Sequence, residues 1–315
     1  MANKSQLPLL DDFLLHIQTN NYSKETLYNY ERDLRTFENF LNDEMSGLPF
    51  SEVTKRIIEQ FKAYLTSKDR KSAIGASTHK MLSSGSINRI LSSLRRYIAY
   101  LIDMDYESPV APESIKLLRK EKKHPQVAEL EDLVRLIEFP SEFEKNKMVA
   151  LRNRAMLEVL FSTGMRISEL VTLKRVQIDK TGRIFITGKG KKQRFVYLTP
   201  RAHEHINNYL DERGDDFPAL FIPYRGLNNQ DKDKHVSTNY MQMKIKQYRE
   251  LLGINVPTSA HSLRHGFATY LAESGANPAA VQILLGHESL DTTTRYVHAS
   301  DKFAEKSHKK FHPLK

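Results

Sequence analysis

Residues 183–198 read RIFITGKGKKQRFVYL, and this stretch decides the fold class. Apolar and polar residues alternate over Arg183–Thr187 and over Arg194–Leu198, and both runs are rich in Ile, Phe, Val and Tyr. A period of two is typical of β-strands, and the glycine-containing GKGKKQ between the runs suits a turn. The stretch therefore predicts an antiparallel hairpin, to which Val176–Asp179 is a candidate third strand.

The first third of the chain has a different period. Its apolar residues recur every three or four positions, as in amphipathic helices, and Ser23 suits the N-cap of the second helix. Four helical stripes are predicted there: Phe13–Ile17, Leu27–Leu41, Val53–Leu65 and Ile87–Leu101.

Helical periodicity also surrounds the hairpin. Helices are predicted over Leu130–Ile137, over Arg152–Ser162 with Gly164 as its stop, and again from Pro200 onward. Asn277–Pro278 suits a helix start, and Gly286 suits the end of that helix. The sequence thus predicts an α+β fold, mostly helical, with one small antiparallel sheet.

The length of 315 residues indicates two domains, because single cores stop growing near this size. Tyr106–Gln126 contains three prolines and the basic run Lys116–Lys123, which suits a domain boundary. We therefore expect an N-terminal helical domain over 1–115, a basic linker over 116–126 and a second domain over 127–315. The linker follows a DNA backbone in one interpretation and is simply solvated in the other.

The composition narrows the classes of function. There are 48 Lys and Arg residues against 38 Asp and Glu, a formal charge of +10, which favours a polyanionic partner such as nucleic acid. The absence of cysteine excludes disulfides, thiolate catalysis and cysteine-based zinc sites. No apolar run has membrane-spanning length, and MANKSQLPLLDDF has no signal-peptide core, so we expect a cytoplasmic, nucleoid-associated protein with no membrane partner.

The chemistry is concentrated in the second half. HSLRH places His261, Arg264 and His265 at i, i+3 and i+4, so a helix would present them on one face. His261 and His265, at i and i+4, also have the spacing of two zinc ligands, although the motif contains no general-base Glu. A guanidinium between two imidazoles favours an anion instead.

The other candidates are single residues in short motifs: Arg166 in LFSTGMRISEL, Lys189 in TGKGKKQR, His287 in LLGHES and Tyr296 in TTRYVH. Each has a plain alternative. Lys189 suits an ordinary basic hairpin, His287 suits a helix C-terminus, and a lone tyrosine is usually packed in a core or interface. Several cations converging on one hydroxyl, however, is what metal-free cleavage of a phosphodiester requires.

Taken together, these motifs resemble those of the tyrosine recombinase (phage integrase) family, and most closely the Xer-type recombinases. The flanking patterns TGxRxxEL, GKGxKxR, HxLRHxxAT and LLGHxSxxTTxxY all match, as does T-x-x-x-Y-x-x-D-L-x-x-F at Thr26–Phe37. The polar stretch Ser67–Ser84 is longer than the corresponding Xer loop. The resemblance implies six catalytic residues: Arg166, Lys189, His261, Arg264, His287 and Tyr296.

The resemblance also implies an architecture and a reaction. A helical, SAM-like core-binding domain precedes a mixed catalytic domain, and Tyr296 attacks the scissile phosphate to form a 3′-phosphotyrosyl link. Arg166 and Arg264 clamp the phosphate oxygens, Lys189 protonates the 5′-oxygen, and His261 accepts the tyrosine proton or holds the phosphate.

The remaining roles implied by the resemblance are auxiliary. His287 donates a hydrogen bond to the phosphate, Glu169 orients a cation, and His265 supports its helix. No ATP, metal or other cofactor is expected. The expected partner is a double-stranded DNA target site, bound by a homotetramer, or by a heterotetramer with a second recombinase, that passes through a Holliday junction. The tail with Phe303 and Phe311 is predicted either to pack as a helix on a neighbouring protomer or to fray.

Basic residues elsewhere are candidate DNA contacts, for which a merely solvated face is the alternative. They are Lys24, Arg32, Arg35, Arg89, Arg95, Arg96, Arg119, Lys120, Lys122, Lys191 and Lys244. Three other functions stay open at this point. They are a type IB topoisomerase-like relaxase, a non-catalytic DNA-binding protein of the same fold, and a metal hydrolase using His261, His265 and His287.

Overall fold

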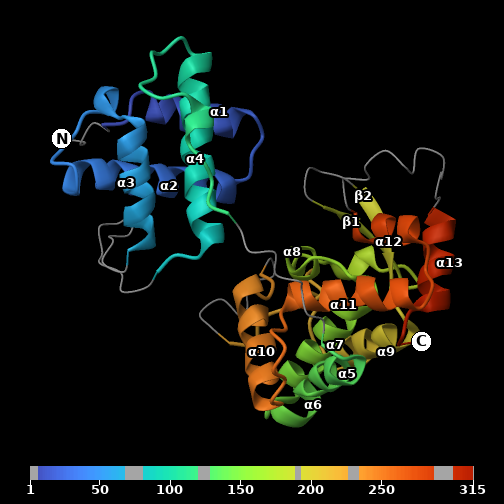
Figure 1. Cartoon of the computed structure of the whole chain (residues 1–315). Coiled ribbons are helices and arrows are strands. Elements are labelled where there is room, and N and C mark those ends of the chain that lie inside the picture. The colour runs from blue at the N-terminus through green and yellow to red at the C-terminus, as the bar shows by residue number, and fades with distance from the viewer. Residues whose placement is uncertain are drawn as a thin grey trace. The chain divides into compact units, whose positions relative to one another are not determined.

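The computed structural model describes residues 6–67, 81–119, 128–188, 193–225, 234–286 and 301–314. The chain divides into two compact units, Met1–Lys123 and His124–Lys315, each with its own core. Figure 1 labels the elements of both units. The limits expected for the two domains and the linker stay a prediction.

The N-terminal unit is a helical bundle, as the apolar stripes predicted. Ser23 caps α2 by accepting a hydrogen bond from the backbone N–H of Thr26 at 3.1 Å. The third predicted stripe starts too early, because Thr54 caps α3 and leaves Val53 buried in extended backbone before it. The helices are α1 (Leu10–Thr19), α2 (Lys24–Asp43), α3 (Lys55–Thr66) and α4 (Ser84–Asp103).

The C-terminal unit is built around α7 (Lys147–Thr163), whose residues are buried along most of its length. Helix α7 contacts α5 (Leu130–Glu138), α6 (Pro140–Phe143), α8 (Ile167–Val171), α9 (Pro200–Asp211) and α11 (Ala260–Glu273). The other helices that the structure describes in this unit are α10 (Thr238–Leu251), α12 (Pro278–Leu285) and α13 (Asp301–Phe311).

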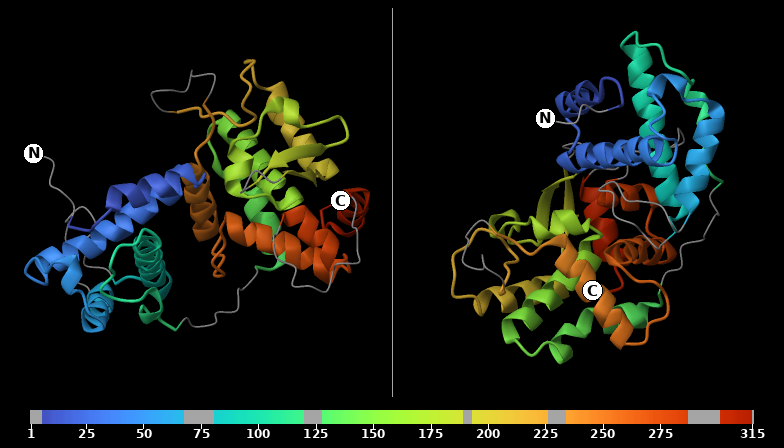
Figure 2. Two further views of the ribbon diagram at one scale, coloured as in Figure 1. Left: turned by 90° about the horizontal axis from the view of Figure 1, so that it is seen from above. Right: turned by 90° about the vertical axis from the view of Figure 1, so that its left-hand side faces the viewer.

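The predicted hairpin strands form one antiparallel pair, β1 (Arg183–Thr187) and β2 (Gln193–Tyr197), with Ile184 opposite Val196. Strand β2 contacts α12 and α13, and the views in Figure 2 show these elements together. The fold class is therefore confirmed as mostly helical with a small antiparallel sheet.

The third strand proposed at Val176–Asp179 is wrong. Residues Arg175–Gln177 form a 3-10 turn, closed by the Gln177 side chain, which accepts a hydrogen bond from the backbone of Lys174 at 2.8 Å. Ile178 then makes an isolated bridge to Ile184. A local side-chain bond that completes the turn therefore competes with extension of the sheet.

The predicted stops at Gly164 and Gly286 and the predicted cap at Asn277 are confirmed, whereas α7 begins at Lys147 and not at the predicted Arg152. Gly164 ends α7 with φ 62°, and a Cβ there would lie 2.4 Å from the ring of Phe267. Gly286 ends α12 with φ 64°, and Asn277 caps its start. Both glycines adopt a left-handed conformation that other residues rarely take.

The tail is a helix, α13, and its described side chains are not those of a frayed end. His308 and His312 are 1% and 2% exposed. His312 Nε2 lies 3.1 Å from the carbonyl of Phe161, and His308 Nε2 contacts the carbonyl of Ser162. The helix therefore packs on the end of α7 of its own chain. Within the described ranges, no helix has the length and apolar character needed to cross a membrane.

Candidate active site

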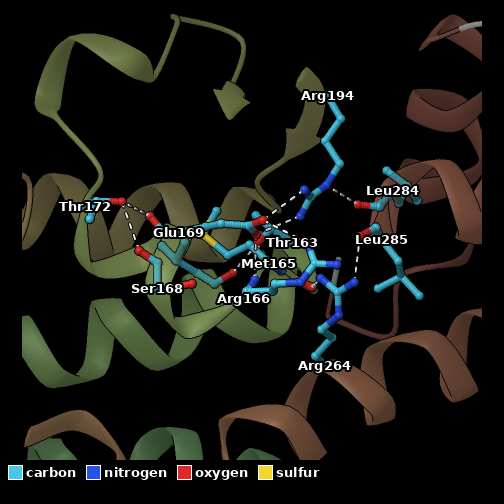
Figure 3. Close-up of polar contacts among 12 residues, drawn as sticks. Thr163, Met165, Arg166, Ser168, Glu169, Thr172, Arg194, Arg264, Leu284 and Leu285 are labelled. Atoms are coloured by element: carbon cyan, nitrogen blue, oxygen red, sulfur yellow. Dashed lines mark hydrogen bonds and ion pairs between the residues drawn. The ribbon is translucent and has the colours of Figure 1, made fainter. Parts of the chain in front are cut away.

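Four charged side chains meet where α8, β2 and α11 come together: Arg166, Glu169, Arg194 and Arg264 (Figure 3). We call them the arginine cluster. Gly164 turns the chain out of α7, and Arg166 is the N-cap residue of the short helix α8. The turn between α7 and α8 therefore places Arg166 at the start of the next helix, as its position after Gly164 suggested.

Glu169 is the only carboxylate of this cluster, and it is 8% exposed. Its two oxygens accept hydrogen bonds from Arg194 at 3.0 and 2.8 Å, from the Arg166 guanidinium at 3.0 Å and from the Arg166 backbone at 2.7 Å. Burial alone would raise the pKa of Glu169, but these bonds, that of Arg194 first, lower it below its usual value. Glu169 is therefore held as an anion.

Arg264 comes from α11 and is 6% exposed. Its two terminal nitrogens donate to the carbonyls of Gly164 at 2.7 Å and Leu285 at 2.6 Å. Burial, and then the positive charges of Arg166 and Arg194, lower its pKa to about 10. The guanidinium remains charged at neutral pH, although its surroundings already carry positive charge.

The cluster is short of negative charge. Its three arginines and one glutamate leave a formal surplus of two positive charges (3 − 1 = 2). The Arg166 side chain is 36% exposed, whereas that of Arg194 is 8% exposed. Arg166 is thus the member of the cluster that an incoming anion reaches most directly.

The two histidines of HSLRH differ from the arginine between them. His261 is exposed in the first turn of α11, and His265 is half-buried one turn later. Among the described residues, no group of three His, Asp or Glu side chains is arranged to hold a metal ion. The zinc-site alternative therefore gains no support from this part of the chain.

Several predicted residues lie outside the described ranges: Lys120, Lys122, Lys189, Lys191, His287 and Tyr296. Two described glycines immediately precede two of them in the sequence. Gly188 and Gly286 both approach Arg194, since a Cβ on them would lie 3.0 Å from its Nη1 and 2.9 Å from its Cδ, respectively. The chain thus reaches the cluster one residue before Lys189 and one residue before His287.

In the N-terminal unit, some predicted DNA-contact residues have intramolecular partners. Arg89 pairs with the buried carboxylate of Asp33, which also accepts a 2.8 Å hydrogen bond from Ser93. Arg35 pairs with Glu38 at 2.7 Å. These cations are therefore oriented by neighbouring carboxylates.

The other predicted contacts vary in exposure. Arg95 is half-buried and donates to the carbonyl of Ile115, so it does not lie on a solvated face as the helical pattern suggested. Lys244 pairs with Glu144 at 2.7 Å, and Arg32 donates to Asn29 at 2.9 Å. Three are exposed: Lys24, Arg96 and Arg119.

Sequence reasoning missed Arg194 as a site residue. It is the last residue of the quoted pattern GKGxKxR, and its place in a half-buried strand was the available signal. A strand residue pairs locally with the opposite strand, here Ile186. The link from Arg194 to Glu169 spans 25 positions and becomes visible only when the strand has been folded against α8.

Comparison with known proteins adds the family. The profile of the phage integrase family matches residues 126–302, and that of the phage integrase N-terminal SAM-like domain matches residues 10–104. Tyrosine recombinase XerD of Staphylococcus epidermidis is 30% identical over 314 residues, covering 97% of this chain and 98% of that protein. Tyrosine recombinase XerC of Pelobacter propionicus is 34% identical over 316 residues, covering 97% and 96%.

Solved structures show the same fold. A XerH site-specific recombinase bound to difH substrate in a pre-cleavage complex aligns with a TM-score of 0.67 and 22% identity, over 98% of this chain and 84% of that one. A lambda integrase(75-356) dimer bound to a COC′ core site aligns with a TM-score of 0.68 and 17% identity, over 95% and 99%. The family profiles and the nearly full-length relatives place the chain in the phage integrase family, as a site-specific tyrosine recombinase of the Xer type.

Proposed function

We propose that this recombinase cuts and rejoins DNA through a 3′-phosphotyrosyl intermediate formed by Tyr296, with the arginine cluster as its phosphate site. The observation that carries the proposal is the surplus of two positive charges around the single carboxylate of Glu169 (3 − 1 = 2). A scissile phosphate brings one negative charge in the ground state and more as the transition state forms. Preorganised cations stabilise that added charge.

The phenolic oxygen of Tyr296 forms a bond to phosphorus, and the bond from phosphorus to the 5′-oxygen breaks. The tyrosine proton passes to a base, for which His261 is the candidate, and Lys189 supplies a proton to the leaving oxygen. Because a free tyrosine has a pKa of about 10, its attack depends on such a base or on nearby positive charge.

Arg166 and Arg264 have complementary parts in this proposal. Arg264 is fixed by two backbone carbonyls and approaches the phosphate as a rigid donor, whereas Arg166 is the more exposed of the two. His287 adds a further hydrogen bond, and His265 supports α11. The energy of the phosphodiester is retained in the tyrosyl link, so the return step needs neither ATP nor metal.

The N-terminal unit, expected over 1–115, is proposed to bind the DNA target, followed by the linker over 116–126 and the catalytic domain over 127–315. Arg89 supports this role best, because its guanidinium is exposed yet held by a buried carboxylate, an arrangement that presents a fixed donor to a base edge or phosphate. Lys24, Arg96 and Arg119 add exposed positive charge.

The assembly on DNA is proposed from the relatives. One solved relative is a lambda integrase tetramer bound to a Holliday junction. Four copies of this chain, or two copies with two of a second recombinase, would join two duplexes through such a junction. We further propose that the protein works in the cytoplasm, on the nucleoid.

The test is covalent trapping. The protein is incubated with a pool of short nicked duplexes in EDTA, and SDS-resistant protein–DNA adducts are isolated and sequenced. We expect adducts from the wild type and none from Tyr296→Phe, with DNA binding retained. Tyr270→Phe is the matched control, because Tyr270 lies on α11 and its hydroxyl donates to the carbonyl of Ala128 at 2.9 Å.

The other outcomes point elsewhere. DNA binding without any adduct would support the non-catalytic DNA-binding protein. Adduct formation together with relaxation of supercoiled DNA in the absence of a partner site would support the relaxase. Loss of all activity in EDTA, with activity restored by zinc, would support the metal hydrolase.

A further inference from the structure

We propose that Arg194 is a positioning residue that sets the phosphate site by tying α8, β2 and the end of α12 together. Its three guanidinium nitrogens are all engaged. Nη1 and Nη2 donate to the two oxygens of Glu169 at 3.0 and 2.8 Å, and Nε donates to the carbonyl of Leu284 at 2.9 Å. Three of its five N–H donors therefore hold protein groups, and its side chain is only 8% exposed.

The first link is to Arg166. Glu169 receives the Arg194 fork on one side and both the backbone and side chain of Arg166 on the other. Rotation of the Glu169 carboxylate would break bonds to both arginines. The carboxylate of Glu169 therefore connects Arg166 to strand β2.

The second link is to the end of α12. Arg194 holds the carbonyl of Leu284, and Arg264 holds the carbonyl of Leu285, the next residue. Two arginines thus bind successive carbonyls in the last turn of α12. Arg194 thereby fixes the backbone that also receives Arg264 (Figure 3).

The packing leaves Arg194 little freedom. Its side chain is 8% exposed. Both glycines lie close to it: a Cβ on Gly188 would lie 3.0 Å from its Nη1, and a Cβ on Gly286 would lie 2.9 Å from its Cδ. A lysine at this position would keep the charge but could not bind both carboxylate oxygens and the carbonyl together.

The inference rests on the proposed function, and its test uses a buried arginine of the same chemistry elsewhere in the unit. The Arg213 side chain is 0% exposed, pairs with both oxygens of Asp215 and donates to the carbonyls of Ala219 and Leu220 at 3.0 and 2.7 Å. Arg194→Lys and Arg213→Lys therefore lose the same kinds of bonds, but only the first is expected to move the phosphate site.

Three quantities are measured for each variant of the full-length chain: melting temperature, affinity for a duplex containing the cleavage site, and the single-turnover rate of adduct formation. We expect both variants to have a lower melting temperature than the wild type and the same affinity for DNA. Only Arg194→Lys should slow adduct formation, by about 100-fold, the cost of a displacement of about 1 Å in a reacting geometry. Equal rates for the two variants would overturn the inference.

Arg194→Ala keeps the test open if Arg194→Lys does not fold. Guanidinium ion, at concentrations below those that denature the wild type, should restore part of its adduct formation by occupying the vacated position. No restoration in a folded Arg194→Ala variant would overturn the inference. Failure of the wild type itself to form adducts would instead overturn the proposed function.

Discussion

Two groups of arginines in the C-terminal unit differ in their charge balance. The arginine cluster has three arginines around Glu169, a surplus of two (3 − 1 = 2). The second group, which we call the balanced cluster, consists of Glu138, Arg154, Glu158 and Arg201. Its charges cancel (2 − 2 = 0), and the nitrogen–oxygen distances of its ion pairs are 2.7–3.3 Å.

Even the nearby histidine preserves this balance. His205 lies 3.8 Å from Glu158, but burial and then the charge of Arg154 lower its pKa, which favours the neutral ring. The charges of the balanced cluster thus cancel one another, although Glu158 Oε2 is buried without a hydrogen-bond partner. A buried cluster that retains a surplus is stable only with an external anion nearby or with exposure to water, and this difference supports the proposal that the arginine cluster is the phosphate site.

The largest difference between the clusters is expected from arginine-to-lysine variants. Arg264→Lys should slow adduct formation by about 100-fold or more, because lysine cannot supply the planar fork that stabilises the phosphate. Arg154→Lys, at a 7% exposed position in the balanced cluster, should change stability without this loss. The measurement is single-turnover trapping of the covalent adduct, and near-normal cleavage by Arg264→Lys would remove it from the phosphate clamp.

The next test removes one carboxylate charge from each cluster. Glu169→Gln raises the surplus of its cluster from two to three, and Glu158→Gln raises the other from zero to one. Each should cost about 3 kcal/mol of unfolding free energy, as for a broken buried pair. Sulfate should then raise the melting temperature of Glu169→Gln more than chloride does at equal ionic strength. The same sulfate response in both variants would contradict the distinction between the clusters.

A smaller effect is expected where the backbone approaches the arginine cluster. Gly286→Ala and Gly253→Ala introduce a side chain at φ 64° and 67°. A Cβ on Gly253 would have no atom within 4 Å, whereas a Cβ on Gly286 would lie 2.9 Å from Arg194. Both variants should lose about 1 kcal/mol of unfolding free energy from the backbone conformation. Only Gly286→Ala should also slow adduct formation, and equal rates would mean that the approach to Arg194 is unimportant.

A pH effect is expected from the two buried histidines of α13. Burial is the main cause that lowers the pKa of His308 to about 4 and that of His312 to about 3, from an ordinary 6.5. The unfolded chain then binds more protons below pH 6.5, so the free energy of unfolding should fall as pH decreases from 6.5 towards 4. Urea unfolding at several pH values measures this slope, which His308→Gln together with His312→Gln should reduce. An unchanged slope in that double variant would assign the pH dependence to other groups.

Much of the fold was predictable because its signals are local. Ser23 and Asn277 cap helices through bonds to residues two or three positions away, and Gly164 ends its helix through its own backbone conformation. The hairpin followed from alternation within five-residue strands. The third strand failed because Gln177 closes a local turn that periodicity does not reveal.

The candidate site was predictable in part. The motif order named Arg166, Glu169 and Arg264, and the structure places these three together. It did not name Arg194, whose partners lie 25 and 90 positions away. Nor did it reveal that Asp33 holds Arg89 across 56 positions.

The sequence by itself determined the helices, their caps, the hairpin and the order of the chemical groups, because each depends on a few neighbouring residues. Only the tertiary structure decided how charge is distributed among the buried arginines. Arg264 reaches Gly164 across 100 positions, and His308 reaches Ser162 across 146. Contacts of this kind depend on how the helices pack, and burial raises the free-energy cost of each charge that has no partner.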